Sequence, residues 1–265
     1  MMRALYSAAS GMKAQQTNVD NISNNIANVN TAGFKRGRAD FQDLLYEQIK
    51  LAGTETEEGN EIPVGIQLGH GVGVGSISKI FTQGVVQSTN KATDLAIEGE
   101  GFFQIQLPSG ETAYTRAGNF HTDSTGRLLT SDGNLLVPQV TVPTNINKET
   151  DLAVALDGTV AYRDPDTGQS VNLTNITLTS FTNPSGLEAI GNNLFVATPA
   201  SGEARSGTPG LEGLVVVRHK YLEYANVQIV DEMVNLIIAQ RAYEVNSKSI
   251  QASDDMLNTA NNVKR

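Results

Sequence analysis

Residues 5–29 read LYSAASGMKAQQTNVDNISNNIANV, and this stretch decides how the chain is organised. One series of residues recurs every seven positions, and a second series follows it three positions later. This spacing predicts an α-helix that buries one narrow stripe against a partner. The first series is Leu5, Met12, Val19 and Ile26, and the second is Ala8, Gln15, Ile22 and Val29.

The C-terminal end repeats the pattern. Ile229, Leu236, Tyr243, Ile250 and Leu257 are again seven residues apart, and Val230, Met233, Val234 and Ile237 widen the stripe in its first half. We therefore expect residues 1–35 and 220–265 to form one helical assembly domain. The predicted assembly seam consists of Leu5, Met12, Val19, Ile22, Ile26, Val29, Ile229, Met233, Leu236, Tyr243, Ile250 and Leu257.

Neither helix is expected to be stable alone. The first contains Gly11 and six asparagines between Asn18 and Asn30, each costing up to ~1 kcal/mol relative to Ala. Isolated helices are marginal in water without a packed face. The two ends could pack on each other or on other subunits, and their separation by a long β-rich middle favours packing between subunits. The first helix should end at residues 30–33, where Gly33 suits a left-handed conformation.

The middle of the chain changes character twice. Residues 36–75 are predicted to form an extended connecting segment with a short helix over 39–50, because Phe41, Leu44, Leu45 and Ile49 share one helical face. Residues 76–219 are predicted to form a β-rich outer domain.

Strand signals support this β-rich domain. Phe103, Ile105 and Leu107 alternate with glutamines, as in a half-buried strand, and further β-favouring runs cover 135–142, 152–155, 160–162 and 176–181. The expected fold class is therefore α+β, with coiled-coil-type helices at both ends of a mainly β middle domain.

The composition limits the classes of function. A net charge of −9 argues against nucleic acid as a partner, because that binding depends on cationic contacts with phosphates. The absence of Cys excludes disulfides, thiolate zinc sites and a cysteine nucleophile. No apolar run approaches the roughly 18 residues of a membrane span, and residues 1–12 are too short and polar for a secretory signal. The chain is thus expected to stay in the cytoplasm or to leave by a route without a cleaved signal.

The sequence also lacks a recognisable reactive site. His70, His121 and His219 have no paired metal-ligand spacing. Ser10 and Lys13 match an S-x-x-K string without the other motifs of that enzyme class, and the alternating glycines of 69–75 never complete a dinucleotide-binding motif. We therefore predict a structural protein with no catalytic residues, no metal and no cofactor.

Several stretches resemble the bacterial flagellar rod and hook family. The resemblance lies in residues 24–35 (NNIANVNTAGFK), 99–105 (GEGFFQI), 114–120 (YTRAGNF), 187–194 (LEAIGNNL), 232–237 (EMVNLI) and 240–248 (QRAYEVNSK). The residues taken from the terminal motifs are Asn25, Asn28, Asn30, Gly33, Phe34, Gln240, Arg241, Tyr243 and Asn246. The chain departs from the family at His219-Lys220, where Gln-Gly is frequent.

The resemblance implies a function and a set of partners. Residues 43–46 and 65–69 look most like the distal-rod members, which implies a drive-shaft subunit that polymerises through its terminal helices and transmits torque from motor to hook. The implied partners are further copies in a helical rod, proximal rod and hook subunits, surrounding ring proteins and the type III export apparatus. The implied location is the periplasm-spanning rod of the basal body, reached without a cleaved signal. A proximal rod or hook subunit, and a surface adhesin or cell-wall-binding protein, remain alternatives.

Overall fold

The computed structural model describes residues 2–53, 63–143, 146–147, 151–165, 168–210 and 215–263. The chain forms two compact units. The helical unit contains residues 1–27, 37–78 and 228–265, and the β unit contains residues 28–36 and 79–227. Helices at both chain ends flank a mainly β middle, so the α+β class is confirmed.

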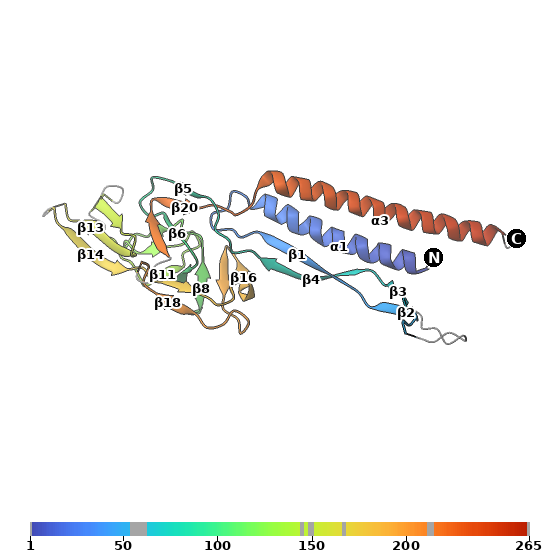
Figure 1. Cartoon of the computed structure of the whole chain (residues 1–265). Helices are drawn as coiled ribbons and strands as arrows, with labels where there is room; N and C mark the ends of the chain where they lie inside the picture. The colour runs from blue at the N-terminus through green and yellow to red at the C-terminus, as the bar shows by residue number, and fades with distance from the viewer. Residues whose placement is uncertain are drawn as a thin grey trace. The chain divides into compact units, whose positions relative to one another are not determined.

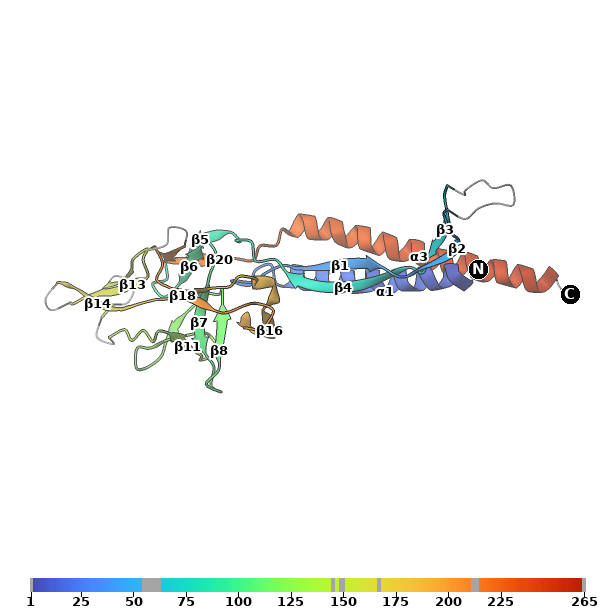
Figure 2. The same cartoon turned by 60° about the horizontal axis from the view of Figure 1, so that its bottom comes forward.

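The helical unit is built on two long antiparallel helices, α1 (Met2–Ala27) and α3 (Ile229–Val263), which lie side by side in Figures 1 and 2. Both terminal helices were predicted. The first ends at Ala27, a few residues earlier than expected, and a turn follows it. Gly33 closes this turn with φ +70°, in the left-handed conformation that the sequence predicted.

Four strands accompany the helix pair. Strand β1 (Gly37–Asp43) pairs with β4 (Val72–Lys79), and β2 (Tyr46–Lys50) pairs antiparallel with β3 (Ile66–Gly69). Figure 2 shows β1 and β4 running along α1. The start of β1 is attached to this helix, because the side-chain amides of Asn21 and Asn25 both donate to Gly37 O at 2.9 Å.

The short helix predicted over 39–50 is wrong, because these residues belong to β1 and β2. Four apolar residues of this stretch have helical spacing, but they do not pack together against a core. They are Phe41, Leu44, Leu45 and Ile49. Phe41, Leu45 and Ile49 are instead exposed. Pairing with β4 and β3 supplies the backbone hydrogen bonds, and tertiary pairing of this kind overrides local propensity.

The β unit contains a nine-stranded sheet, a three-stranded sheet and two strand pairs. The main path of the large sheet is β16-β17-β8-β7-β11-β10-β9, and β15, which pairs with β7 and β18, branches from it. Its strands are β7 (Phe102–Gln106), β8 (Thr112–Thr115), β9 (His121–Thr122), β10 (Leu128–Leu129), β11 (Leu135–Val137), β15 (Leu178–Ser180), β16 (Glu188–Gly191), β17 (Leu194–Val196) and β18 (Arg205–Gly207). A single 3₁₀ turn covers Pro184–Gly186.

The smaller sheets complete the unit. The three-stranded sheet has the order β12 (Leu152–Val154), β13 (Thr159–Arg163), β14 (Ser170–Asn175). The two pairs are β6 (Leu95–Glu98) with β19 (Val216–His219), and β5 (Val86–Ser88) with β20 (Tyr221–Glu223). The strand predicted at 103–107 is confirmed as β7, and the runs at 152–155 and 160–162 correspond to β12 and β13.

Strand β7 separates two cores. Phe103 and Ile105 are fully buried on one face, in the main aliphatic core with Leu95, Ile97 and Leu136. Phe102 lies on the other face, in an aromatic cluster with Tyr114, Phe181 and Phe195 that Phe81 covers. The rings meet edge to face, with centroids 4.8–6.2 Å apart, a geometry that stabilises aromatic pairs beyond their buried area.

Candidate assembly surface

The α1–α3 seam contains small and polar residues. Glu232, Ala239 and Ser253 are the buried residues of α3, and Ala8, Ala14, Ile22 and Asn25 are those of α1. Glu232, Ala239, Asn246 and Ser253 are spaced by seven, so they form a second heptad series three residues after Ile229 and its equivalents. This series contains no large apolar residue, so hydrophobic periodicity does not predict it.

Most large apolar residues of α3 are exposed and not buried in this seam, whereas Leu236, Ile250 and Leu257 are partly buried. Nine are exposed, with 42–72% of their surface accessible. They are Ile229, Val230, Met233, Val234, Ile237, Ile238, Tyr243, Val245 and Met256, and we call them the outward apolar face. A helix that buries its small residues and exposes its large ones has an unpartnered surface. Each such side chain contributes about 1.5–3 kcal/mol when it is fully buried.

The predicted seam residues therefore divide between these surfaces. Ile22 is buried between elements of the helical unit, and Ile229, Met233 and Tyr243 belong to the outward apolar face. The others are partly buried, and they are Leu5, Met12, Val19, Ile26, Val29, Leu236, Ile250 and Leu257. Val29 packs in the β unit, near Phe34. The pairing of the two ends, which the sequence left open, is present within the chain, and the outward apolar face remains available for another molecule.

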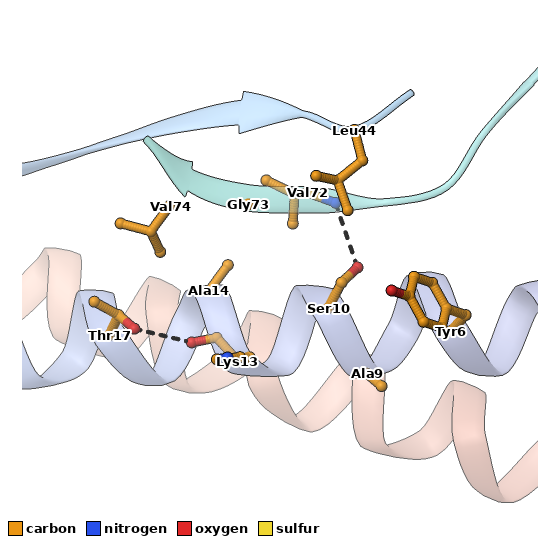
Figure 3. Close-up of a pocket in the computed structure, with 10 residues that line it drawn as sticks. All are labelled: Tyr6, Ala9, Ser10, Lys13, Ala14, Thr17, Leu44, Val72, Gly73 and Val74. Carbon is orange, nitrogen blue, oxygen red and sulfur yellow. Dashed lines mark hydrogen bonds between the residues drawn. The ribbon is translucent and has the colours of Figure 1, made fainter. Parts of the chain in front are cut away.

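A groove lies between α1 and the ends of β1 and β4. It has a volume of about 530 Å³ and is lined by Tyr6, Ala9, Ser10, Lys13, Ala14, Thr17, Leu44, Val72, Gly73 and Val74 (Figure 3). The Ser10 hydroxyl donates to Ser7 O at 2.8 Å and accepts from Val72 N at 3.3 Å. Ser10 therefore attaches a strand to α1, and the S-x-x-K string has a structural role.

The β2–β3 ribbon also exposes apolar side chains. They are Leu45, Tyr46, Ile49, Leu51, Val64, Ile66 and Leu68, from the ribbon and the residues beside it. A two-stranded ribbon is only marginally stable alone in water. Arg3 of α1 forms an ion pair with Glu47 at 2.5 Å, which attaches β2 to the helix.

The strongest electrostatic feature is a buried ionic cluster in the β unit, formed by Lys35, Arg116 and Glu223. Lys35 Nζ lies 2.6 Å from one carboxylate oxygen of Glu223, and Arg116 Nη2 lies 2.8 Å from the other. All three side chains are at most 3% exposed. Burial lowers the pKa values of Lys35 and Arg116, and the attraction of Glu223 opposes this effect in both.

Backbone groups complete the ionic cluster. Lys35 donates to Thr82 O at 2.8 Å, Arg116 donates to Gly99 O and Gly101 O, and Gly84 N donates to Glu223 at 2.8 Å. Buried charges that are paired and hydrogen-bonded in this way hold a single local conformation. The cluster connects residues 28–36, 79–85 and 221–227, the segments by which the chain leaves the β unit.

The residues chosen from the family motifs serve several purposes. Position 33 requires Gly for two reasons. Its φ is left-handed, and the backbone of Ala117 lies so close that an added Cβ would be 2.4 Å from Ala117 N. Phe34 is buried against Ala225 and Val227, and the Asn28 side chain accepts from the Thr31 hydroxyl at 3.3 Å. Of the other motif residues, Asn25 is buried and Asn246 is partly buried. The exposed ones are Asn30, Gln240, Arg241 and Tyr243, and Arg241 forms an ion pair with Glu244 at 2.8 Å.

Within the described ranges, no group of three or more His, Asp or Glu side chains is placed to hold a metal ion. None of the described helices is long and apolar enough to cross a membrane. His219, one of the three histidines, donates a hydrogen bond from Nε2 to Ala92 O at 2.8 Å inside the β unit. The outward apolar face and the exposed apolar side chains of the β2–β3 ribbon supply contact surface, as expected of a protein that assembles with other molecules.

Family models identify the same class in three places. The model of the flagella basal body rod protein matches residues 5–35, and that of the flagellar basal body rod FlgEFG protein C-terminal matches residues 218–263. Between them, the flagellar hook protein FlgE/F/G D1 domain matches residues 96–162. The matches thus cover α1, α3 and much of the β unit.

Two relatives match over all or nearly all of the chain, and a third matches about half of it. The flagellar basal-body rod protein FlgG of Borreliella burgdorferi is 49% identical over 265 residues, with both chains fully covered. FlgG of Caulobacter vibrioides is 50% identical, with 97% of each chain covered. The flagellar hook protein FlgE of Treponema pallidum is 49% identical over 49% of this chain and 27% of its own. The chain therefore belongs to the FlgG family of flagellar basal-body rod proteins, the structural subunits of the distal rod.

Proposed function

We propose that the chain forms the distal rod by burying the outward apolar face of α3 against further copies of itself. The observation that carries the proposal is the arrangement of α3, whose buried residues Glu232, Ala239 and Ser253 are small or polar, whereas nine of its large apolar residues are exposed. Each copy in a rod contacts several neighbours, so contacts of this kind add up over the lattice.

The rest of the mechanism follows from this assembly. The helical units form the inner shaft, the β units form the outer layer that faces the surrounding ring proteins, and the shaft carries torque from the motor to the hook. Proximal rod and hook subunits are the neighbours at the two ends. The subunit acts without catalysis. It reaches its place in the periplasm-spanning rod through the type III export apparatus.

The helix pair explains how a subunit can pass through an export apparatus and assemble afterwards. Few large side chains are buried between α1 and α3, and ordering a helix costs about 1–2 kcal/mol per residue in backbone entropy. Before assembly the two helices are therefore easily unfolded. The β unit, with its two cores, provides the stable part of the subunit.

Electron cryotomography of cells that lack the gene tests the role. A basal body that ends after a short proximal rod, without hook or filament, supports the distal-rod function. Loss of the whole rod would assign the chain to the proximal rod, and a rod without a hook would assign it to the hook. A complete rotating flagellum would contradict the proposal.

A further inference from the structure

A buried polar contact joins three elements of the helical unit. Asn25 of α1 is 1% exposed and Glu232 of α3 is 2% exposed. The Asn25 amide donates to Glu232 Oε2 at 3.3 Å and to Gly37 O at 2.9 Å, and Gly37 N donates to Asn25 Oδ1 at 2.9 Å. We call Asn25, Gly37 and Glu232 the polar node. A buried amide and carboxylate are costly without such partners, so the node favours one mutual position of α1, β1 and α3.

A second contact supports the same position. Gly11 of α1 faces Asn246 of α3 so closely that a Cβ on Gly11 would lie 2.9 Å from the Asn246 side-chain nitrogen. Gly11 and Asn25 are 14 residues apart, and so are Glu232 and Asn246, in the opposite direction along the antiparallel pair. The two contacts therefore belong to one register and lie two heptads apart.

Apolar packing does not select this register. Both helices repeat their apolar residues every seven positions, so sliding one helix by a heptad, about 10.5 Å, again places apolar residues opposite apolar residues. Sliding in one direction places Asn25 opposite Ala239 and moves Glu232 past the end of α1. Sliding in the other direction places Glu232 opposite Asn18 and moves Asn25 beyond the start of α3. Each slipped register thus separates Asn25 from Glu232.

We propose that the polar node sets the register of the α1–α3 pair, with Asn25 and Glu232 as positioning residues and the Gly11–Asn246 contact as a secondary determinant. Buried polar pairs fix register in coiled coils at a cost in stability. The register determines where along the shaft each copy presents its outward apolar face. This consequence for assembly rests on the proposed function, whereas the register itself is a property of the single chain.

Disulfide trapping measures the register directly, because the chain contains no native Cys. Cysteines at Gly11 and Asn246 report the observed register, since their side chains come within disulfide reach. Cysteines at Gly11 with Ala239, or at Gly11 with Ser253, report the two registers slipped by one heptad. The first reporter also removes the Gly11–Asn246 contact, so it isolates the effect of the polar node.

The three reporter pairs are compared in the purified full chain under mild oxidation, on non-reducing gels. With Asn25 and Glu232 intact, we expect the intrachain 11–246 disulfide to exceed either slipped disulfide by about tenfold or more, as expected of a buried polar pair that specifies register. In Asn25→Leu/Glu232→Leu, we expect a slipped disulfide to reach a comparable yield. The control Asn24→Leu/Asp231→Leu changes the preceding, exposed residue of each helix and should keep the original ratio.

Two results would overturn the proposal. One is an unchanged ratio in the double leucine variant, which would mean that another feature sets the register. The other is a predominance of disulfides between chains when the node is intact. Circular dichroism at 222 nm verifies that helix is retained. If the double variant loses its helix, the same reporters are measured in the Glu232→Ala variant. Unchanged disulfide ratios in that variant contradict the proposal. Because these measurements use the unassembled chain, their outcome is independent of the rod-assembly result.

Discussion

Replacement of Glu223 by Gln should destabilise the β unit more than any other single change in charge. The Glu223 carboxylate is fully buried and accepts hydrogen bonds from Lys35, Arg116 and Gly84 at 2.6–2.9 Å. Glutamine has nearly the same shape but no charge, so two buried cations would lose their only counter-charge within the cluster. Removing one partner of a buried ion pair costs about 3–5 kcal/mol.

Deprotonation of Lys35 limits the loss of stability in the Glu223→Gln variant. Burial already lowers the pKa of Lys35, and without Glu223 the ammonium can lose its proton more easily. Arg116 cannot lose its charge in this way, because a guanidinium stays protonated in proteins. We therefore expect Lys35→Met to restore part of the stability lost in Glu223→Gln, because it removes one uncompensated charge. A restoration of about 1 kcal/mol or more would demonstrate coupling between the two residues.

Urea unfolding followed by tyrosine fluorescence measures these changes, since the chain contains no Trp. The matched control is Glu98→Gln, which breaks the half-exposed pair with Arg218 in the same unit. Solvent screens that pair, so its loss should have a much smaller effect. If Glu223→Gln and Glu98→Gln lower the free energy of unfolding equally, the reasoning about the ionic cluster is refuted.

Three further predictions concern single positions. Lys220 has φ +65°, so Lys220→Gly should raise the free energy of unfolding by about 1 kcal/mol; a decrease in urea midpoint would contradict this. Burial lowers the pKa of His219, and a hydrogen bond with Ala92 O only partly opposes it. The folded state thus binds fewer protons than the unfolded state, and stability should fall as pH drops below the unfolded-state value of about 6.5. His219→Gln should flatten this dependence between pH 7.5 and 5.5, and an unchanged slope would exclude His219 as its source. Ile237→Asp, on the outward apolar face, should abolish swimming and rod assembly in complemented deletion cells, whereas Gln240→Asp should leave both intact; normal motility of the Ile237 variant would count against that face.

The heptad series made the two terminal helices predictable, and the alternation around Phe103 did the same for β7. Periodicity also misled the prediction over residues 39–50, because helical spacing there results from two strands with different partners. The turn at Gly33 was predictable from its residue type. The replacement of the family's frequent Gly by Lys220 marked a position with unusual backbone, and the positive φ gives the reason.

The polar seam was harder to predict. Glu232, Ala239, Asn246 and Ser253 share the heptad spacing of the apolar series, but a search for large apolar residues passes over them. The ionic cluster could not be predicted from the sequence. Lys35, Arg116 and Glu223 are far apart along the chain, and each alone resembles a surface charge. The pairing of β5 with β20, the path of residues 28–36 and the position of Arg116 directly after β8 bring them together.

The ionic cluster has a mechanical consequence. The chain leaves the β unit at residues 28, 36, 79 and 227, and the segments that contain these points are joined to one another by Lys35, Glu223 and the Asn226 amide, which donates to Ile80 O and Thr82 O. Tension on any one of these segments is therefore shared with the others before it reaches the sheets.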